Sequence, residues 1–405
     1  MKALSMRMER YLELKQKMTL DPNFKPKIYD VLDFRDDVPE VKLINENWVK
    51  VKVKLAGICG TDMHLLTIEQ STCLANFASF PGIPGHEIVG VVTEVGENVH
   101  NIQIGDRVLI DENLSCEVRG LELCDACQEG DFGLCYNLDK GDIAPGTLTG
   151  YLCVDTGGGW GEYIVAHKIQ ILKIPDSVSF EEALISESLA VSIHGIFKCP
   201  PKDTDKVIVV GCGVMGLAVI LALKSFSKCS IIAIDTRQQQ LDIAKKFGVD
   251  DVFLSKKDLH IKKIARKLGI RTVSPILENV YPVGGGADVI FDCVGSASSL
   301  NTSLRLVKPK GNVILIGYPA HIEIDWTPIM AKEISITGSN IFGSETINGE
   351  RKRTMQVALE LISSGKVNVS DFVTHKFALD DYKQALEVAS QKDKYNSIKV
   401  VFEYD

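Results

Sequence analysis

The sequence lacks an excess of basic residues. Its 45 Lys and Arg are outnumbered by 53 Asp and Glu, so the formal net charge at pH 7 is −8. A nucleic-acid-binding protein is expected to present a basic surface, and this balance argues against a nucleic-acid partner. The N-terminal run through Leu20 mixes Lys, Arg and Glu and has no apolar centre, so it does not resemble an export signal. We therefore expect a cytoplasmic protein.

The chain also lacks an apolar run of membrane-spanning length. Val207–Leu223 is seventeen residues without a charge, but it contains three glycines and falls short of the usual span. This pattern predicts a buried strand, a turn and the start of a helix, and no membrane partner. A disulfide framework is not expected either, because the eleven cysteines are odd in number and no signal peptide precedes them. They are interpreted as thiols and metal ligands.

Two kinds of pattern follow one another along the 405 residues, which is enough chain for two or three domains. From Trp48 valines alternate with lysines, as in a strand with one wet face. From Lys206 strands and helices alternate, which predicts a parallel sheet covered by helices. The expected strands are 49–55, 89–95, 107–110, 162–167, 207–210, 231–234, 289–292, 313–316, 334–338 and 398–402, and the expected helices are 181–196, 214–225, 237–247, 298–307 and 355–364.

Two segments fit neither pattern. A possible strand at 1–4 and a helix-prone stretch at 7–18 belong to an N-terminal insertion of about residues 5–45, whose role the sequence does not reveal. Residues 111–161 form a long, cysteine- and glycine-rich loop, and loops of this length are usually functional or tied by metal.

Two sequence motifs contain residues of the types that bind a catalytic zinc. Gly85-His86-Glu87 opens a Gly-His-Glu-x2-Gly-x5-Gly-x2-Val pattern, and Cys59-Gly-Thr-Asp-x-His lies upstream. Thiolate, imidazole and carboxylate are all zinc ligands, and a catalytic zinc takes three protein ligands plus an open position. Together the motifs resemble those of the zinc-dependent medium-chain alcohol dehydrogenases, nearest their polyol and threonine dehydrogenase branches. The resemblance extends over roughly Trp48 to Phe402.

The resemblance implies a catalytic zinc held by Cys59 and His86. The remaining carboxylate ligand is either Glu87 or Glu187, or the two alternate. Glu187 resembles the carboxylate of polyol dehydrogenases, although Ser188 stands where those enzymes usually have proline. A lone cysteine is more often a buried core thiol, but the spacing and register of both motifs favour a metal ligand at Cys59.

Three polar residues follow Cys59 closely. The Thr61 hydroxyl can take a proton from a zinc-bound alcohol, and His64 can carry it to solvent. Asp62 has the chemistry to orient His86 by accepting its second N–H. Taken singly, each is more often a turn-stabilising residue. The register of the family favours the proton relay, more strongly for Thr61 than for His64.

A second cysteine group lies within the long loop. Cys124-x2-Cys127-x7-Cys135 matches three of the four ligands of the family's structural zinc. The usual first ligand falls at Leu121, which cannot bind metal, and Cys116 is the natural substitute. We expect four thiolates around a closed structural zinc rather than four idle thiols.

A nucleotide-binding pattern lies in the second half. Gly211, Gly213 and Gly216 follow a strand and open a helix, as in a dinucleotide fingerprint. Asp235 ends the next strand, where a carboxylate binds ribose hydroxyls and disfavours NADP relative to NAD. Arg237 slightly weakens that preference. Lys399 resembles a late cationic position that contacts pyrophosphate in relatives, and a solvated lysine at a strand edge is the alternative.

These features predict an α/β protein with a doubly wound parallel Rossmann cofactor domain and a mostly-β GroES-like catalytic domain. The expected division is 1–189 and 343–405 for the catalytic domain and 190–342 for the NAD-binding domain. We predict reversible oxidation of a secondary alcohol, polyol or amino alcohol by a homodimer or homotetramer. A zinc-independent quinone reductase of the same fold lacks the Cys59, His86 and Glu87 set. A non-catalytic zinc- and nucleotide-binding protein would have no use for Thr61 and His64.

Overall fold

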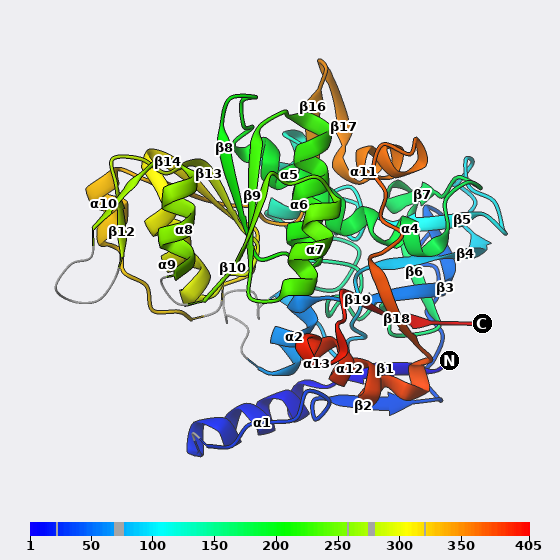
Figure 1. The fold of residues 1–405 in the computed structure, drawn as a ribbon. Coiled ribbons are helices and arrows are strands. Elements are labelled where there is room, and N and C mark those ends of the chain that lie inside the picture. Colours follow the sequence, from blue (N-terminus) through cyan, green and yellow to red (C-terminus); the bar gives the residue numbers. More distant parts are fainter. Residues whose placement is uncertain (22, 69–76, 257–258, 274–279, 320) are drawn as a thin grey trace. The chain divides into compact units, whose positions relative to one another are not determined.

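The chain divides into two compact units. A computed structural model describes residues 1–21, 23–68, 77–256, 259–273, 280–319 and 321–405 (Figure 1). The first unit comprises Met1–Glu187 and Thr346–Asp405, and the second comprises Ser188–Glu345. The boundaries expected from the sequence lie within three residues of these divisions. Cys73, to which the sequence gives no metal-binding role, lies outside the described residues.

The N-terminal insertion has regular structure. Strand β1 (Ala3–Met6) pairs antiparallel with β2 (Leu32–Arg35), and helix α1 (Met8–Leu20) lies between them in sequence. All four residues of β1 are buried, so this pair belongs to the core of the first unit. The expected strand and helix are both present, with their bounds displaced by one or two residues.

The first unit is built on strand β3 (Trp48–Ile58). Val49, Val51 and Val53 are fully buried, while the intervening lysines are half-buried, as the alternation predicts. The seven-stranded sheet has the order β18-β19-β3-β4-β5-β7, with β6 also paired to β3. The other elements are β4 (Ile88–Val95), β5 (Arg107–Ile110), β6 (Tyr163–His167), β7 (Ile171–Lys173), β17 (Glu350–Arg353), β18 (Val373–Phe377), β19 (Lys399–Glu403), α2 (Gly60–Leu66), α3 (Asp125–Gln128), α4 (Phe180–Leu184), α11 (Thr354–Ser363), α12 (Tyr382–Ser390) and α13 (Lys392–Tyr395).

The last strand returns to the first unit, as the sequence predicts. Strand β19 pairs antiparallel with β3 and parallel with β18. It therefore lies inside the sheet rather than at its edge, and residues from the end of the chain are placed next to the strand that ends at Cys59.

The second unit contains a six-stranded parallel sheet. Its strand order is β10-β9-β8-β13-β14-β15, and every neighbouring pair is parallel. The order reverses between β8 and β13, and ligands of such sheets bind beyond the carboxyl ends of the strands at that reversal. Its elements are β8 (Lys206–Val210), β9 (Ser230–Asp235), β10 (Asp251–Leu254), β11 (Arg271–Val273), β12 (Tyr281–Val283), β13 (Ala287–Asp292), β14 (Val307–Leu315), β15 (Ser335–Gly338), α6 (Val214–Phe226), α7 (Gln238–Lys246), α8 (Leu259–Lys267), α9 (Ala297–Leu306) and α10 (Thr327–Lys332).

Two sequence expectations concern helices. The single helix expected at 181–196 is wrong in detail, because the structure ends α4 at Leu184 and begins α5 (Ser186–Lys198) two residues later. The uncharged run 207–223 forms β8, a glycine turn and most of α6, as predicted.

Among the described residues, no helix is both long and apolar enough to cross a membrane. A short hairpin strand, β16 (Ser344–Ile347), spans the unit boundary.

Candidate active site and metal centres

Cys59, His86 and Glu87 are brought together by strand pairing. Cys59 follows the last residue of β3, and His86 and Glu87 directly precede β4. Because the two strands are antiparallel, with Ala56 opposite Ile88, the end of one meets the start of the other. One ligand atom from each side chain lies within 4.8 Å of the others. A thiol, an imidazole and a carboxylate at this spacing fit a zinc ion.

Asp62 lies behind the imidazole. Its Oδ1 is 3.5 Å from His86 Nδ1, and its Oδ2 accepts a hydrogen bond of 2.8 Å from the Cys59 backbone N–H. Burial lowers the pKa of His86, but Asp62 and Cys59 raise it, and the net effect is upward. Nδ1 faces Asp62, which leaves Nε2 to bind a metal, and an orienting role for Asp62 stays a prediction.

Glu87 is held by an unexpected partner. Both of its carboxylate oxygens accept hydrogen bonds from Lys399 Nζ, at 2.5 and 2.6 Å. The side chains of Lys399 and Glu87 are 3% and 1% exposed. Burial raises the pKa of Glu87, while Lys399 and His86 lower it, so that the pKa ends below its ordinary value. The alternative of a solvated strand-edge lysine is wrong, since Lys399 is buried within the sheet.

Gly57 makes room for this carboxylate. A Cβ atom at this position would lie 1.7 Å from Glu87 Oε2 and 2.8 Å from its carboxyl carbon. No side chain can therefore replace glycine without moving Glu87. The sequence gives no signal for this role, because Gly57 lies in a strand whose contacts with Glu87 depend on the pairing with β4.

Thr61, His64 and Glu187, the other residues predicted for this zinc site, lie in helices α2 and α5. Thr61 Oγ1 is 3.6 Å from Cys59 Sγ, and His64 lies further along α2. Glu187 lies in the first turn of α5 and is buried, but it does not belong to the group of ligand atoms within 4.8 Å. The charge of Glu187 raises the pKa of Lys399 and the pKa of Glu112, so Glu187 interacts electrostatically with both residues.

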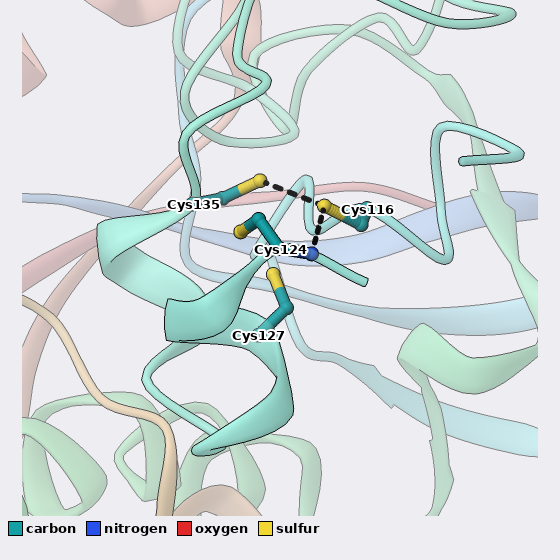
Figure 2. A group of neighbouring side chains, drawn as sticks. All are labelled: Cys116, Cys124, Cys127 and Cys135. Carbon is teal, nitrogen blue, oxygen red and sulfur yellow. Dashed lines mark hydrogen bonds between the residues drawn. The ribbon is translucent and has the colours of Figure 1, made fainter. Parts of the chain in front are cut away.

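The four loop cysteines form a second cluster, as Figure 2 shows. Their sulfur atoms lie within 4.8 Å of one another, with Cys116 Sγ 3.5 Å from Cys135 Sγ. The Cys124 backbone N–H donates to Cys116 Sγ at 3.4 Å, and such bonds favour thiolates. Leu121, the position of the usual first ligand, packs against the cluster without contributing to it. The group Cys116, Cys124, Cys127 and Cys135 fits a tetrahedral zinc.

A fully buried arginine organises the loop around these cysteines. The Arg119 guanidinium donates to the backbone carbonyls of Leu114, Lys140, Ile143, Ala144 and Gly146. It thereby ties together two parts of a loop that has little regular structure. No local pattern in the sequence signals this role.

The glycine motif forms the turn between β8 and α6. Gly213 is the N-cap of α6, and a Cβ at Gly216 would lie 1.7 Å from the Gly211 carbonyl oxygen. The Asp235 carboxylate supports this turn by accepting 2.6 Å and 2.8 Å hydrogen bonds from the backbone N–H groups of Cys212 and Arg237. The turn presents a helix N-terminus of the kind that binds phosphate groups.

Comparison with known proteins identifies the family. Residues 45–176 match the alcohol dehydrogenase GroES-like domain, and residues 214–364 match the zinc-binding dehydrogenase domain. The chain is 30% identical over 357 residues to L-idonate 5-dehydrogenase of Vitis vinifera, covering 87% of each protein. This chain belongs to the zinc-dependent medium-chain alcohol dehydrogenases. It is also 29% identical to sorbitol dehydrogenase of Arabidopsis thaliana, over 87% of this chain and 88% of that protein.

The fold of this dehydrogenase agrees with that assignment. The structure of 2R,3R-butanediol dehydrogenase from Bacillus subtilis superposes with a TM-score of 0.72, at 24% identity, over 100% of this chain and 99% of that one. The predicted architecture, a GroES-like unit with a Rossmann nucleotide-binding unit, is thereby confirmed, and the family match confirms the zinc-dependent dehydrogenase class.

Proposed function

We propose that this enzyme oxidises a secondary alcohol of a polyol reversibly, with NAD as the hydride acceptor. The observation that carries the proposal is the group of Cys59, His86 and Glu87, with the Thr61 hydroxyl 3.6 Å from the Cys59 sulfur. Similarity to proteins described as idonate, sorbitol and xylulose-converting enzymes supports a polyhydroxylated substrate. We also propose a cytoplasmic homodimer or homotetramer.

Each residue of the site has a role in this proposal. Cys59 and His86 hold the zinc with a carboxylate from Glu87 or Glu187, or from the two in alternation, and Asp62 orients His86. Thr61 takes the hydroxyl proton and His64 passes it to solvent. When bound, zinc acidifies the substrate hydroxyl and the nicotinamide accepts hydride. The second zinc, at Cys116, Cys124, Cys127 and Cys135, stabilises the loop.

The nucleotide site favours NAD in this proposal. The Asp235 carboxylate lies at the end of β9, where it can hydrogen-bond the ribose hydroxyls and repel a 2′-phosphate. Its ion pair with Arg237, 3.4 Å between Oδ1 and Nε, reduces the arginine charge available to a 2′-phosphate. The contact of Lys399 with a cofactor pyrophosphate stays a prediction, and its bond to Glu87 gives it a second role in fixing that ligand.

A substrate panel tests the function. Zinc-loaded protein is mixed with NAD and separately with polyols, sugars, amino alcohols and simple secondary alcohols, and NADH is followed by absorbance. We expect turnover with polyols and weaker turnover with NADP. A protein that reduces quinones but oxidises none of these alcohols would contradict the proposal.

A further inference from the structure

Glu112 is a buried acidic side chain in the segment that follows β5. It lies two residues after the end of β5, and only 1% of its surface is exposed. Neither carboxylate oxygen has a hydrogen-bond partner among the residues that the structure describes. Leaving a buried polar group unpaired destabilises a folded protein, so this arrangement indicates a function that requires it.

The neighbouring Asp111 shows that this segment can satisfy a carboxylate. Its Oδ1 accepts hydrogen bonds from the backbone N–H and the side-chain amide of Asn113, at 3.2 and 2.9 Å. Its Oδ2 lies 3.4 Å from the Arg353 guanidinium. The lack of a hydrogen bond therefore distinguishes Glu112 from Asp111, the other carboxylate of the turn after β5.

The backbone of Glu112 is hydrogen-bonded to the segment that contacts His86. Its backbone carbonyl accepts a 2.8 Å hydrogen bond from the Thr149 N–H. Tyr151 lies two residues after Thr149, and its ring packs edge-to-face on the His86 imidazole, with 6.0 Å between the ring centroids. Burial and the charge of Glu187 raise the pKa of Glu112, whereas His86 lowers it. Glu112 thus shares the buried environment of His86 and Glu187.

We propose that Glu112 recognises the substrate by accepting a hydrogen bond from a second hydroxyl, on the carbon next to the one that is oxidised. The inference rests on the proposed function and narrows its substrates to vicinal diols and longer polyols. A site built to hydrogen-bond a hydroxyl rejects the analogue that lacks it, because the buried acceptor is then left unpaired. A simple secondary alcohol has no second donor for Glu112.

The test compares a matched pair of substrates, 2,3-butanediol and 2-butanol, in zinc-loaded full-length protein with NAD. We expect wild-type kcat/KM to favour the diol by roughly tenfold to a hundredfold, the effect of leaving one buried acceptor without its hydrogen bond when 2-butanol is bound. In Glu112→Met this preference should fall to within a few-fold, with an intermediate value in Glu112→Gln. Glu117→Gln, an exposed position of the same loop, is the control and should keep the preference.

Three results would overturn the assignment of Glu112. Equal losses on both substrates in Glu112→Met would show that the side chain does not distinguish them. Loss of one zinc from Glu112→Gln would show a metal ligand instead. A preference for 1-amino-2-butanol over the diol in the wild type would contradict a hydroxyl as the partner.

A stability measurement separates failure of this inference from failure of the proposed function. If the wild type oxidises none of the alcohols of the substrate panel, the dehydrogenase proposal fails, but Glu112 can still be tested. Without substrate, Glu112→Met should raise Tm by about 1–3 °C, because an unpaired buried carboxylate is removed. A Tm that is unchanged or lower in both Glu112 variants would show that the carboxylate is already satisfied and would overturn the inference.

Discussion

At the scale of single residues, the catalytic cluster is held by contacts between residues far apart in sequence. Glu87 is held by Lys399, and Gly57 leaves the space that its carboxylate fills. Removing one partner of a buried ion pair is strongly destabilising, by about 3–5 kcal/mol, because the other charge is left uncompensated. The carboxylate ligand is thus sensitive to residues that do not touch the metal.

Gly57→Ala tests this packing. The added methyl group would collide with the Glu87 carboxylate, so the variant should lose the zinc at Cys59 and His86 and part of its stability, about 1–3 kcal/mol as for other overpacked sites. Zinc content per chain and thermal unfolding measure both effects. Gly60→Ala is the matched control, since a Cβ at Gly60 meets no atom within 4 Å. Full zinc content in Gly57→Ala would show that Glu87 is not a ligand.

Thr61 carries the proton-transfer proposal. Replacement by Ala should reduce kcat by about 10²–10⁴-fold, the usual contribution of a general acid–base group, while zinc and NAD binding persist. Thr61→Ser should retain much of the activity because it keeps the hydroxyl. Steady-state kinetics on metal-verified protein provide the measurement, and near-normal turnover of Thr61→Ala would refute the relay.

At the scale of elements, local patterns predicted most strands and helices but not their partners. The alternation of valine and lysine gave β3 correctly, and the glycine spacing located the turn before α6. The pairing of β19 with β3, which delivers Lys399 to Glu87, joins segments far apart in the chain, and periodicity contains no information on it. The break between α4 and α5 was missed for a related reason, because the apolar pattern continues through Ile185.

The cysteine-rich loop is the element that we expect to depend on bound metal for its stability. It has little regular structure, and its cysteines and Arg119 supply its main tertiary ties. Cys116→Ser should therefore lose one zinc and lower Tm, because structural zinc contributes folding free energy directly. Cys229→Ser, a buried cysteine outside both clusters, should keep both zincs. One zinc in the wild type, with unchanged stability in Cys116→Ser, would refute the site.

At the scale of the whole molecule, the two chemistries are divided between two units. The first holds both metal clusters, and the second holds the glycine turn and Asp235. This division could be inferred from the sequence, because each motif lies within a segment whose periodicity reveals its fold class. The roles of Glu112 and Arg119 could not, since they depend on burial and on partners that only the folded chain brings together.

The central claim is that alcohol oxidation depends on metal bound by Cys59, His86 and Glu87. It is tested most directly by measuring zinc per chain and NADH formation together in the wild type and in Cys59→Ser. We predict two zincs and polyol-dependent NADH formation in the wild type. Cys59→Ser should retain the single zinc of the four-cysteine cluster and lose turnover. Near-normal NADH formation by Cys59→Ser with that one zinc would contradict the account.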